Sequence, residues 1–151
     1  MEFIMALYRK NLTSILLVSL LTLSACNMPS SDTTKLTSTL TAASEVPPIN
    51  SKANGVADVH IDVKNYKLSW TIKYSDLSGI VTGAHFHGPA KAGVNADVVV
   101  PINGDLSSPI KGEATLTPEQ TAELLEGKWY VNLHTATHPD GEIRGQVVTK
   151  P

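Results

Sequence analysis

Two histidines separated by one residue, His85 and His87, are the side chains of this sequence best placed to do chemistry. Side chains of an extended chain alternate between two faces, so both imidazoles project to one side, roughly 6–7 Å apart along the strand. Phe86 then points the other way, towards a core. Gly88 and Pro89 end the strand directly afterwards, which places the pair at a rim that an ion or ligand can reach.

A second strand that ends in a histidine is predicted at residues 129–134. Apolar side chains alternate along this segment, which directs Tyr130, Asn132 and His134 away from the core. If the two strands are neighbours in a sheet, the first pair of histidines and His134 converge on one point of the outer surface. Three neutral imidazoles suit copper or zinc, and such a site leaves one coordination position open for water, substrate or a fourth ligand.

Two residues across the next turn, His138 and Glu142, are candidates for that fourth position. An alternative without a metal stays open, in which His85 and His87 hydrogen-bond to the following loop and His134 satisfies buried backbone groups. The sequence therefore predicts His85, His87 and His134 as metal ligands. Copper is favoured over zinc because affinity for nitrogen sites rises towards copper along the first row.

Arg144 follows Glu142 by two residues on the last predicted strand, so both side chains share a face near His134. One interpretation is a cross-strand ion pair between Glu142 and Arg144. The other is that Arg144 lies beside the histidine site and draws anions towards it.

His60 lies between Asp58 and Asp62 in the middle of another predicted strand. The alternation places all three on the hydrophilic side, which predicts a solvated face, and a weak metal site is the alternative. The sequence contains neither a Ser-His-Asp constellation nor a glycine-rich phosphate loop. It therefore predicts no catalytic residue.

Alternating apolar and polar residues over 57–63 and 67–74 predict an antiparallel hairpin with one face on the core. A helix of about two turns is expected to begin at Thr117-Pro118, where Gln120 can complete a capping box, and to end at Gly127. Further strands are expected around residues 36–40, 85–87, 98–102, 110–116, 129–134 and 142–148. The pattern predicts an all-β fold, an antiparallel Greek-key β-sandwich of about eight strands with one short helix. The predicted core residues are Val59, Ile61, Leu68, Trp70, Ile72, Phe86, Val131 and Leu133.

The first 25 residues have the order of a secretory signal: Arg9 and Lys10 precede an apolar run, 12–23, that is too short to span a bilayer. Leu23-Ser24-Ala25-Cys26 closes this run and resembles the lipobox of bacterial lipoproteins, in which the cysteine is lipidated and becomes the first mature residue. The resemblance implies a lipid anchor at Cys26 and a protein outside the cytoplasm, on the outer membrane in a Gram-negative cell. An ordinary signal peptide is the alternative, and export follows in either case.

The expected division of the chain is a signal peptide, 1–25, a lipidated tether, 26–34, and a folded domain, 35–149. Cys26 is the only cysteine, so the domain has no disulfide and its stability must come from the core. Without residues 1–25 the net charge is −3, which does not indicate a nucleic-acid partner. A membrane, reached through the lipid, is the partner that the sequence predicts.

Four segments of the domain resemble the CHRD domain, first described in chordin. They are Glu45-Val46-Pro47-Pro48, Ala84-His85-Phe86-His87-Gly88-Pro89-Ala90, Tyr130-Val131-Asn132-Leu133-His134-Thr135 and Gly141-Glu142-Ile143-Arg144-Gly145-Gln146. The resemblance covers residues 35–149 and implies a β-sandwich found in exported proteins. The family has no generally established activity, so the resemblance predicts the fold better than the function.

A more distant similarity is to copper-zinc superoxide dismutase, whose copper ligands include a His-x-His strand and a later histidine, followed by an arginine near the C-terminus. His85, His87, His134 and Arg144 occur in that order. The sequence lacks a histidine between His87 and His134 that could bridge to zinc, a cluster of zinc ligands and a cysteine pair. The similarity implies a site for one copper ion and does not imply dismutase activity.

Three functions stay open. The first is an exported, membrane-anchored module that binds a metal ion, copper favoured, for storage, delivery or protection. The second is a metal-free module that binds protein or polysaccharide through its rim. The third is a redox enzyme of the dismutase type.

Overall fold

The computed structural model of the protein describes residues 32–150. Its strands are β1 (Thr33–Thr41), β2 (Asn54–Asp62), β3 (Lys67–Ser75), β4 (Val81–His87), β5 (Val98–Pro101), β6 (Ile110–Thr115), β7 (Tyr130–Thr135), β8 (Ile143–Gln146) and β9 (Val148–Thr149). A 3-10 helix, η1 (Ala42–Ser44), follows β1, and an α-helix, α1 (Pro118–Leu125), lies between β6 and β7. Cys26 and the predicted signal peptide lie outside the described residues.

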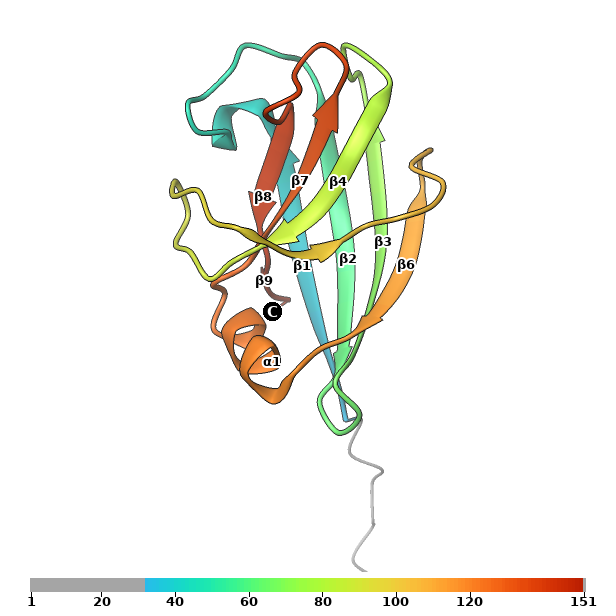
Figure 1. The fold of residues 1–151 in the computed structure, drawn as a ribbon, viewed down its shortest axis with the longest axis vertical. Helices are drawn as coiled ribbons and strands as arrows, with labels where there is room; N and C mark the ends of the chain where they lie inside the picture. Colours follow the sequence, from blue (N-terminus) through green and yellow to red (C-terminus); the bar gives the residue numbers. More distant parts are fainter. Residues whose placement is uncertain (1–31, 151) are drawn as a thin grey trace, which may run out of the picture.

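All nine strands of the described residues belong to one antiparallel sheet with the order β5-β4-β7-β8-β1-β2-β3-β6, and β9 pairs with β1 beside this path. The sheet curls into a nearly closed barrel (Figure 1). Neighbours such as β3 and β6, or β4 and β7, are not consecutive in the chain, as expected for Greek-key connections. The predicted antiparallel all-β fold with one short helix is confirmed, and its strands are joined in one curled sheet.

The predicted hairpin is formed by β2 and β3, which pair along their whole length. Alternate residues of β2 are buried and exposed, as a period of two requires. The other edge of β2 pairs with the whole of β1, which begins at Thr33, two residues before the predicted start of the domain. His60 and Asp58 are exposed on β2, so the predicted solvated face is confirmed.

The helix α1 begins as the sequence predicts. Thr117 and Gln120 exchange the two hydrogen bonds of a capping box, and Leu124 is buried against the core. Within the described part of the chain, no helix has the length and apolar character needed to cross a membrane.

The core lies inside the curled sheet, where strands from opposite sides meet. Trp70 on β3 packs edge-on against Phe86 on β4, with ring centroids 5.2 Å apart. All eight residues predicted for the core are buried. Because Phe86 is held in this core, its neighbours on β4, His85 and His87, point to the outer face.

The strands β4 and β7 are neighbours, which is the condition for the predicted histidine cluster. His85 pairs with Asn132, and Gly83 pairs with His134. On the other side of β7, Arg144 of β8 lies opposite Asn132. The outer face of these three strands therefore carries a row of polar side chains from His85 to Arg144.

Two loops cover much of this outer face, so the expected exposed rim is only partly exposed: His87 is buried, whereas His85 and His134 are of intermediate exposure. The loop between β1 and β2 brings Glu45 against Asn132, and the loop between β4 and β5 brings Ala96 against Tyr130. Tyr130 and Asn132 point away from the core, as the alternation predicts, yet they are only 3% and 2% exposed. The outer face of β4, β7 and β8 therefore carries a largely buried polar layer beneath the two loops, in which His85 and His134 are partly exposed.

The packing of Phe86 leads to a prediction about stability. Phe86→Ala removes a fully buried ring, so we expect the free energy of unfolding to fall by about 3–5 kcal/mol in urea denaturation. Val56→Ala, on β2 at a position that is 47% exposed, is the control and should change it by less than about 0.5 kcal/mol. Equal losses in the two variants would contradict this account of the core.

Candidate metal centre

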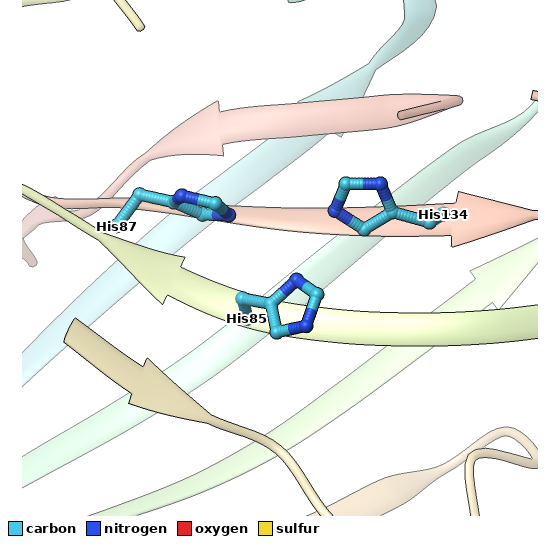
Figure 2. Close-up of side chains that lie close together, drawn as sticks. All are labelled: His85, His87 and His134. Carbon is cyan, nitrogen blue, oxygen red and sulfur yellow. The ribbon is translucent and has the colours of Figure 1, made fainter. Parts of the chain in front are cut away.

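Three imidazole rings meet in the polar layer. One ring nitrogen from each of His85, His87 and His134 lies within 4.8 Å of the other two. Figure 2 shows the three rings gathered above two neighbouring strands, β4 and β7. Within residues 32–150, no other group of three or more His, Cys, Asp or Glu side chains is arranged in this way. The structure brings together the three histidines that the sequence predicts as ligands.

Backbone carbonyl groups orient two of these rings. Nδ1 of His87 lies 3.0 Å from the carbonyl oxygen of Ala96, and Nδ1 of His134 lies 2.9 Å from that of Pro139. Since a carbonyl oxygen can only accept, each Nδ1 donates, which leaves a lone pair on Nε2 of both neutral rings. Both Nε2 atoms are buried and have no hydrogen-bond partner in the described part of the chain.

In His85 the unpartnered ring nitrogen is Nδ1, whereas in His87 and His134 it is Nε2. Nδ1 of His85 is buried and has no partner among residues 32–150. The ring lies over Gly83, where an added Cβ would stand 3.2 Å from Cε1 of His85. Gly83 thus leaves the space that the ring occupies. Sequence reasoning missed this role, for which the signal was a glycine two residues before the His-x-His pair.

Burial favours the neutral form of both β4 histidines. It lowers the pKa of His85 and of His87 below the ordinary value of 6.5, and the nearby imidazole of His134 lowers both further. The hydrogen bond from His87 to Ala96 acts in the opposite direction without reversing the shift. Neutral imidazole is the form that binds a metal ion.

A buried ion pair stands beside the histidines. Nε of Arg144 donates to Oε2 of Glu45 at 2.9 Å, and the two residues are 6% and 4% exposed. Nδ2 of Asn132 donates to the other carboxylate oxygen, Oε1, at 2.6 Å. Nη2 of Arg144 donates to Oδ1 of Asn95 at 2.7 Å, so this guanidinium ties both covering loops to the sheet. Burial raises the pKa of Glu45, although Arg144 acts to lower it.

Tyr130 joins the ion pair to the histidine cluster. Its ring is stacked on that of His87 with centroids 4.8 Å apart, and the guanidinium carbon of Arg144 lies 4.6 Å from the centre of the same ring. The tyrosine hydroxyl accepts a hydrogen bond from the amide of Ala96, whose carbonyl holds His87. A cavity of about 420 Å³ adjoins this stack. Its lining includes His87, Tyr130, Asn132, His134 and Arg144.

Comparison with known protein families agrees with this architecture. Residues 36–147 match the family model of the CHRD domain. The chain belongs to the CHRD-domain family. The matched region contains every strand from β2 to β8 and the whole polar layer. No curated protein and no solved structure gives a significant match to the chain.

In this CHRD domain Arg144 is not paired with Glu142, so that interpretation of the sequence is wrong. The guanidinium binds Glu45, which lies 99 positions away in the chain. The cause is the pairing of Thr41 with Arg144, which brings the end of β1 and the following loop beside β8. The pattern of β8 alone could not indicate this partner.

Neither candidate for the fourth ligand belongs to the group of close ligand atoms in the described residues of the CHRD domain, which contains only the three histidines. Glu142 is fully buried, and its carboxylate accepts hydrogen bonds from Ser51, Ser78 and Thr135. Burial acts to raise the pKa of Glu142, but these hydrogen bonds together hold it below its ordinary value. His138 lies in the turn after β7, where its amide donates to the hydroxyl of Thr135.

The lowered pKa values of His85 and His87 predict that acid destabilises the metal-free domain. Below an ordinary pKa of 6.5 the unfolded chain binds more protons than the folded one, so this stability is complete above that pH and is lost as the pH falls. We expect the free energy of unfolding, measured with a chelator present, to fall from about pH 7.5 to about pH 5.5. His87→Gln should reduce this dependence.

The control for that measurement is His60→Ala, at an exposed position of β2. It should leave the pH dependence unchanged. The raised pKa of Glu45 acts in the opposite direction, because the folded state then binds the extra proton. The contribution of His87 is therefore read from the difference between variants. An identical pH dependence of the free energy of unfolding in the unaltered domain and in His87→Gln would contradict the prediction.

Proposed function

We propose that this CHRD-domain protein binds one metal ion, copper favoured, through Nδ1 of His85 and Nε2 of His87 and His134. The observation that carries the proposal is that one ring nitrogen of each histidine lies within 4.8 Å of the other two, while each ring has a buried nitrogen with no hydrogen-bond partner among the described residues. A metal ion accepts a lone pair from all three rings at once, whereas a neutral His85 has a single N–H and can donate to only one of the other two rings.

The distribution of unpartnered polar atoms supports the same function. Buried polar groups are nearly always hydrogen-bonded in native proteins, since leaving one unpaired costs about 1–3 kcal/mol. Within residues 32–150, eight buried side-chain atoms have no partner, and five of them belong to the polar layer. Those five are His85 Nδ1, His87 Nε2, His134 Nε2, Asn132 Oδ1 and Arg144 Nη1. Such a concentration favours a ligand site over a purely structural role.

Copper is the metal we favour, with zinc as the alternative. Affinity for nitrogen sites rises towards copper along the first row, and neutral imidazoles suit both ions. The order of the three histidines and Arg144 also resembles the copper ligands and arginine of superoxide dismutase. A bound copper ion would supply Lewis-acid and one-electron chemistry, while the rings hold it and the cavity beside them admits a small molecule.

Arg144 is proposed to attract anions to this cavity. Its Nη1 is buried without a partner in the described residues, and the guanidinium lines the same cavity as His87 and His134. The proposed role of the protein is metal storage, delivery or protection outside the cytoplasm. Superoxide assays on copper-loaded protein would distinguish this role from a dismutase.

The direct test is calorimetric titration of residues 27–151 with copper or zinc. We expect about one copper ion per chain, and we expect His85→Ala, His87→Ala or His134→Ala each to weaken binding at least about tenfold, because each removes one of three donors. His60→Ala should bind as the unaltered domain does.

The buried position of His87 makes a fold control necessary for these variants. Circular dichroism should retain a β-sheet spectrum in each. An intact domain that binds neither copper nor zinc, or a triple variant that binds equally well, would leave the metal-free binding module as the function.

A lipid anchor at Cys26 is also part of the proposed function. The support is the charged and apolar order of residues 1–25, followed by the only cysteine of the chain. One acyl chain binds a membrane weakly, whereas the several chains of a lipoprotein hold it stably. The metal site would then act at a membrane surface outside the cytoplasm.

Cell fractionation tests the anchor. Cys26→Ser removes the atom that is acylated, so we expect the protein to move from the membrane fraction to the soluble extracytoplasmic fraction. Thr39→Ser, at an exposed position of β1, is a control that should leave the protein with the membrane. Membrane association of Cys26→Ser equal to that of the unaltered protein would refute the anchor.

A further inference from the structure

The geometry points to Asn132 as a fourth protein donor of the metal centre, acting through its side-chain oxygen Oδ1, an inference that rests on the proposed metal function. Oδ1 is buried and has no hydrogen-bond partner among residues 32–150, and the whole residue is only 2% exposed. It is a second kind of electron-pair donor in the layer that holds the three imidazole nitrogens.

Strand pairing places Asn132 among the histidines. Asn132 is the direct partner of His85 across the β4–β7 pair, and it stands two residues from His134 on the same face of β7. Directly opposed residues of antiparallel strands have Cβ atoms about 4.5–5.5 Å apart. Asn132 also lines the cavity that contains His87 and His134. Its side chain therefore lies beside His85, on the same face as His134, and lines one cavity together with His87.

Glu45 fixes the orientation of the Asn132 amide. Nδ2 of Asn132 donates to Oε1 of Glu45 at 2.6 Å, and the opposite orientation would set an amide oxygen against a carboxylate oxygen. The backbone of Gly141 packs against this hydrogen bond, because a Cβ at position 141 would stand 2.8 Å from Nδ2 of Asn132 and 2.9 Å from Oε1 of Glu45. With its nitrogen held at this carboxylate, the amide must present Oδ1 elsewhere in the layer.

Arg144 holds Glu45 in the position that this orientation needs. Its Nε binds the second carboxylate oxygen, so both oxygens of Glu45 are engaged, one by each neighbouring strand. The hydrogen bonds that link Arg144, Glu45 and Asn132 therefore fix the position of Oδ1 of Asn132. An amide oxygen is a weak ligand for copper and occurs as a long axial donor beside stronger nitrogen ligands.

The test combines a truncation with an exchange of polarity. Asn132→Ala removes the oxygen and leaves the Arg144–Glu45 pair in place. The double variant Asn132→Asp/Glu45→Gln lets the new glutamine amide donate to the new carboxylate while its oxygen accepts from Arg144. The hydrogen bonds between positions 45, 132 and 144 are thereby retained, and the donor facing the histidines becomes a carboxylate oxygen, a stronger ligand than an amide.

Copper affinity of the purified protein is measured by competition with a chelator, and the ligand set by electron paramagnetic resonance of the copper(II) form. We expect Asn132→Ala to weaken binding about ten- to hundredfold and to change the copper hyperfine splitting. The double variant should fold, bind copper at least as tightly as the unaltered protein and give a third, distinct spectrum. Gln146→Ala, on the same face of β8 and outside the hydrogen bonds made by Glu45, is the control and should change neither quantity.

Each other outcome has a definite meaning. If the intact protein binds copper and both Asn132 variants keep its affinity and spectrum, Asn132 is a purely structural residue and this inference is overturned. A double variant that folds but binds more weakly than Asn132→Ala would overturn it as well. If the intact protein binds no copper, the proposed function and this inference are both overturned. If the histidine variants lose copper binding and the Asn132 variants keep it unchanged, only the role of Asn132 as fourth donor is removed.

Discussion

The buried ion pair between Glu45 and Arg144 is the interaction on which the polar layer depends. Taking two charges out of water costs several kcal/mol for each ion, and their attraction offsets this cost only with good geometry and further hydrogen bonds. Asn132 and Asn95 provide those hydrogen bonds. Because the pair joins the loop after β1 to β8, it also holds that loop over the layer, and removing one partner would leave a buried charge at a cost of about 3–5 kcal/mol. The surroundings of the histidine cluster thus depend on an ion pair between the loop after β1 and β8, whereas the histidines themselves lie on β4 and β7.

The strand β7 shows why so much hydrogen bonding is needed. Antiparallel sheets commonly have one face on the core and one in water, but five of the six residues of β7 are buried. Its inner face packs in the barrel, and its outer face, with Tyr130, Asn132 and His134, lies beneath the loops. Each polar group there must find a partner inside the protein. The nitrogen and oxygen atoms without a hydrogen-bond partner in the described residues therefore indicate a ligand, and five of them belong to residues of this one layer.

The core of the barrel and the faces on which the histidines lie could be predicted from the sequence. The loops that cover the polar layer, and the ion pair that holds them, could not. Period-two alternation depends on adjacent residues, so it correctly assigned the core and the face of every histidine on β4 and β7. The cover depends on a contact between residues 99 positions apart, Glu45 and Arg144, and on loops without periodicity. The sequence therefore indicated an exposed rim and could not name Glu45 as the partner of Arg144. Of the two interpretations of Arg144, the ion pair with Glu142 is wrong, and the position beside the histidines is what the structure shows. The role of Gly83 was missed for a similar reason, since the space that a ring occupies is set by the neighbouring strand.

The four segments that resemble the CHRD domain meet in the polar layer. One contributes Glu45, the second the two histidines of β4, the third Asn132 and His134, and the last Arg144. An apolar core tolerates many combinations of residues of suitable volume, so barrel packing alone does not require particular side chains in these segments. A buried polar layer is more demanding, because each donor needs an acceptor at a set distance and direction. The sequence pattern of these segments is therefore better explained by the polar layer and its cluster of lone pairs than by the fold that supports them.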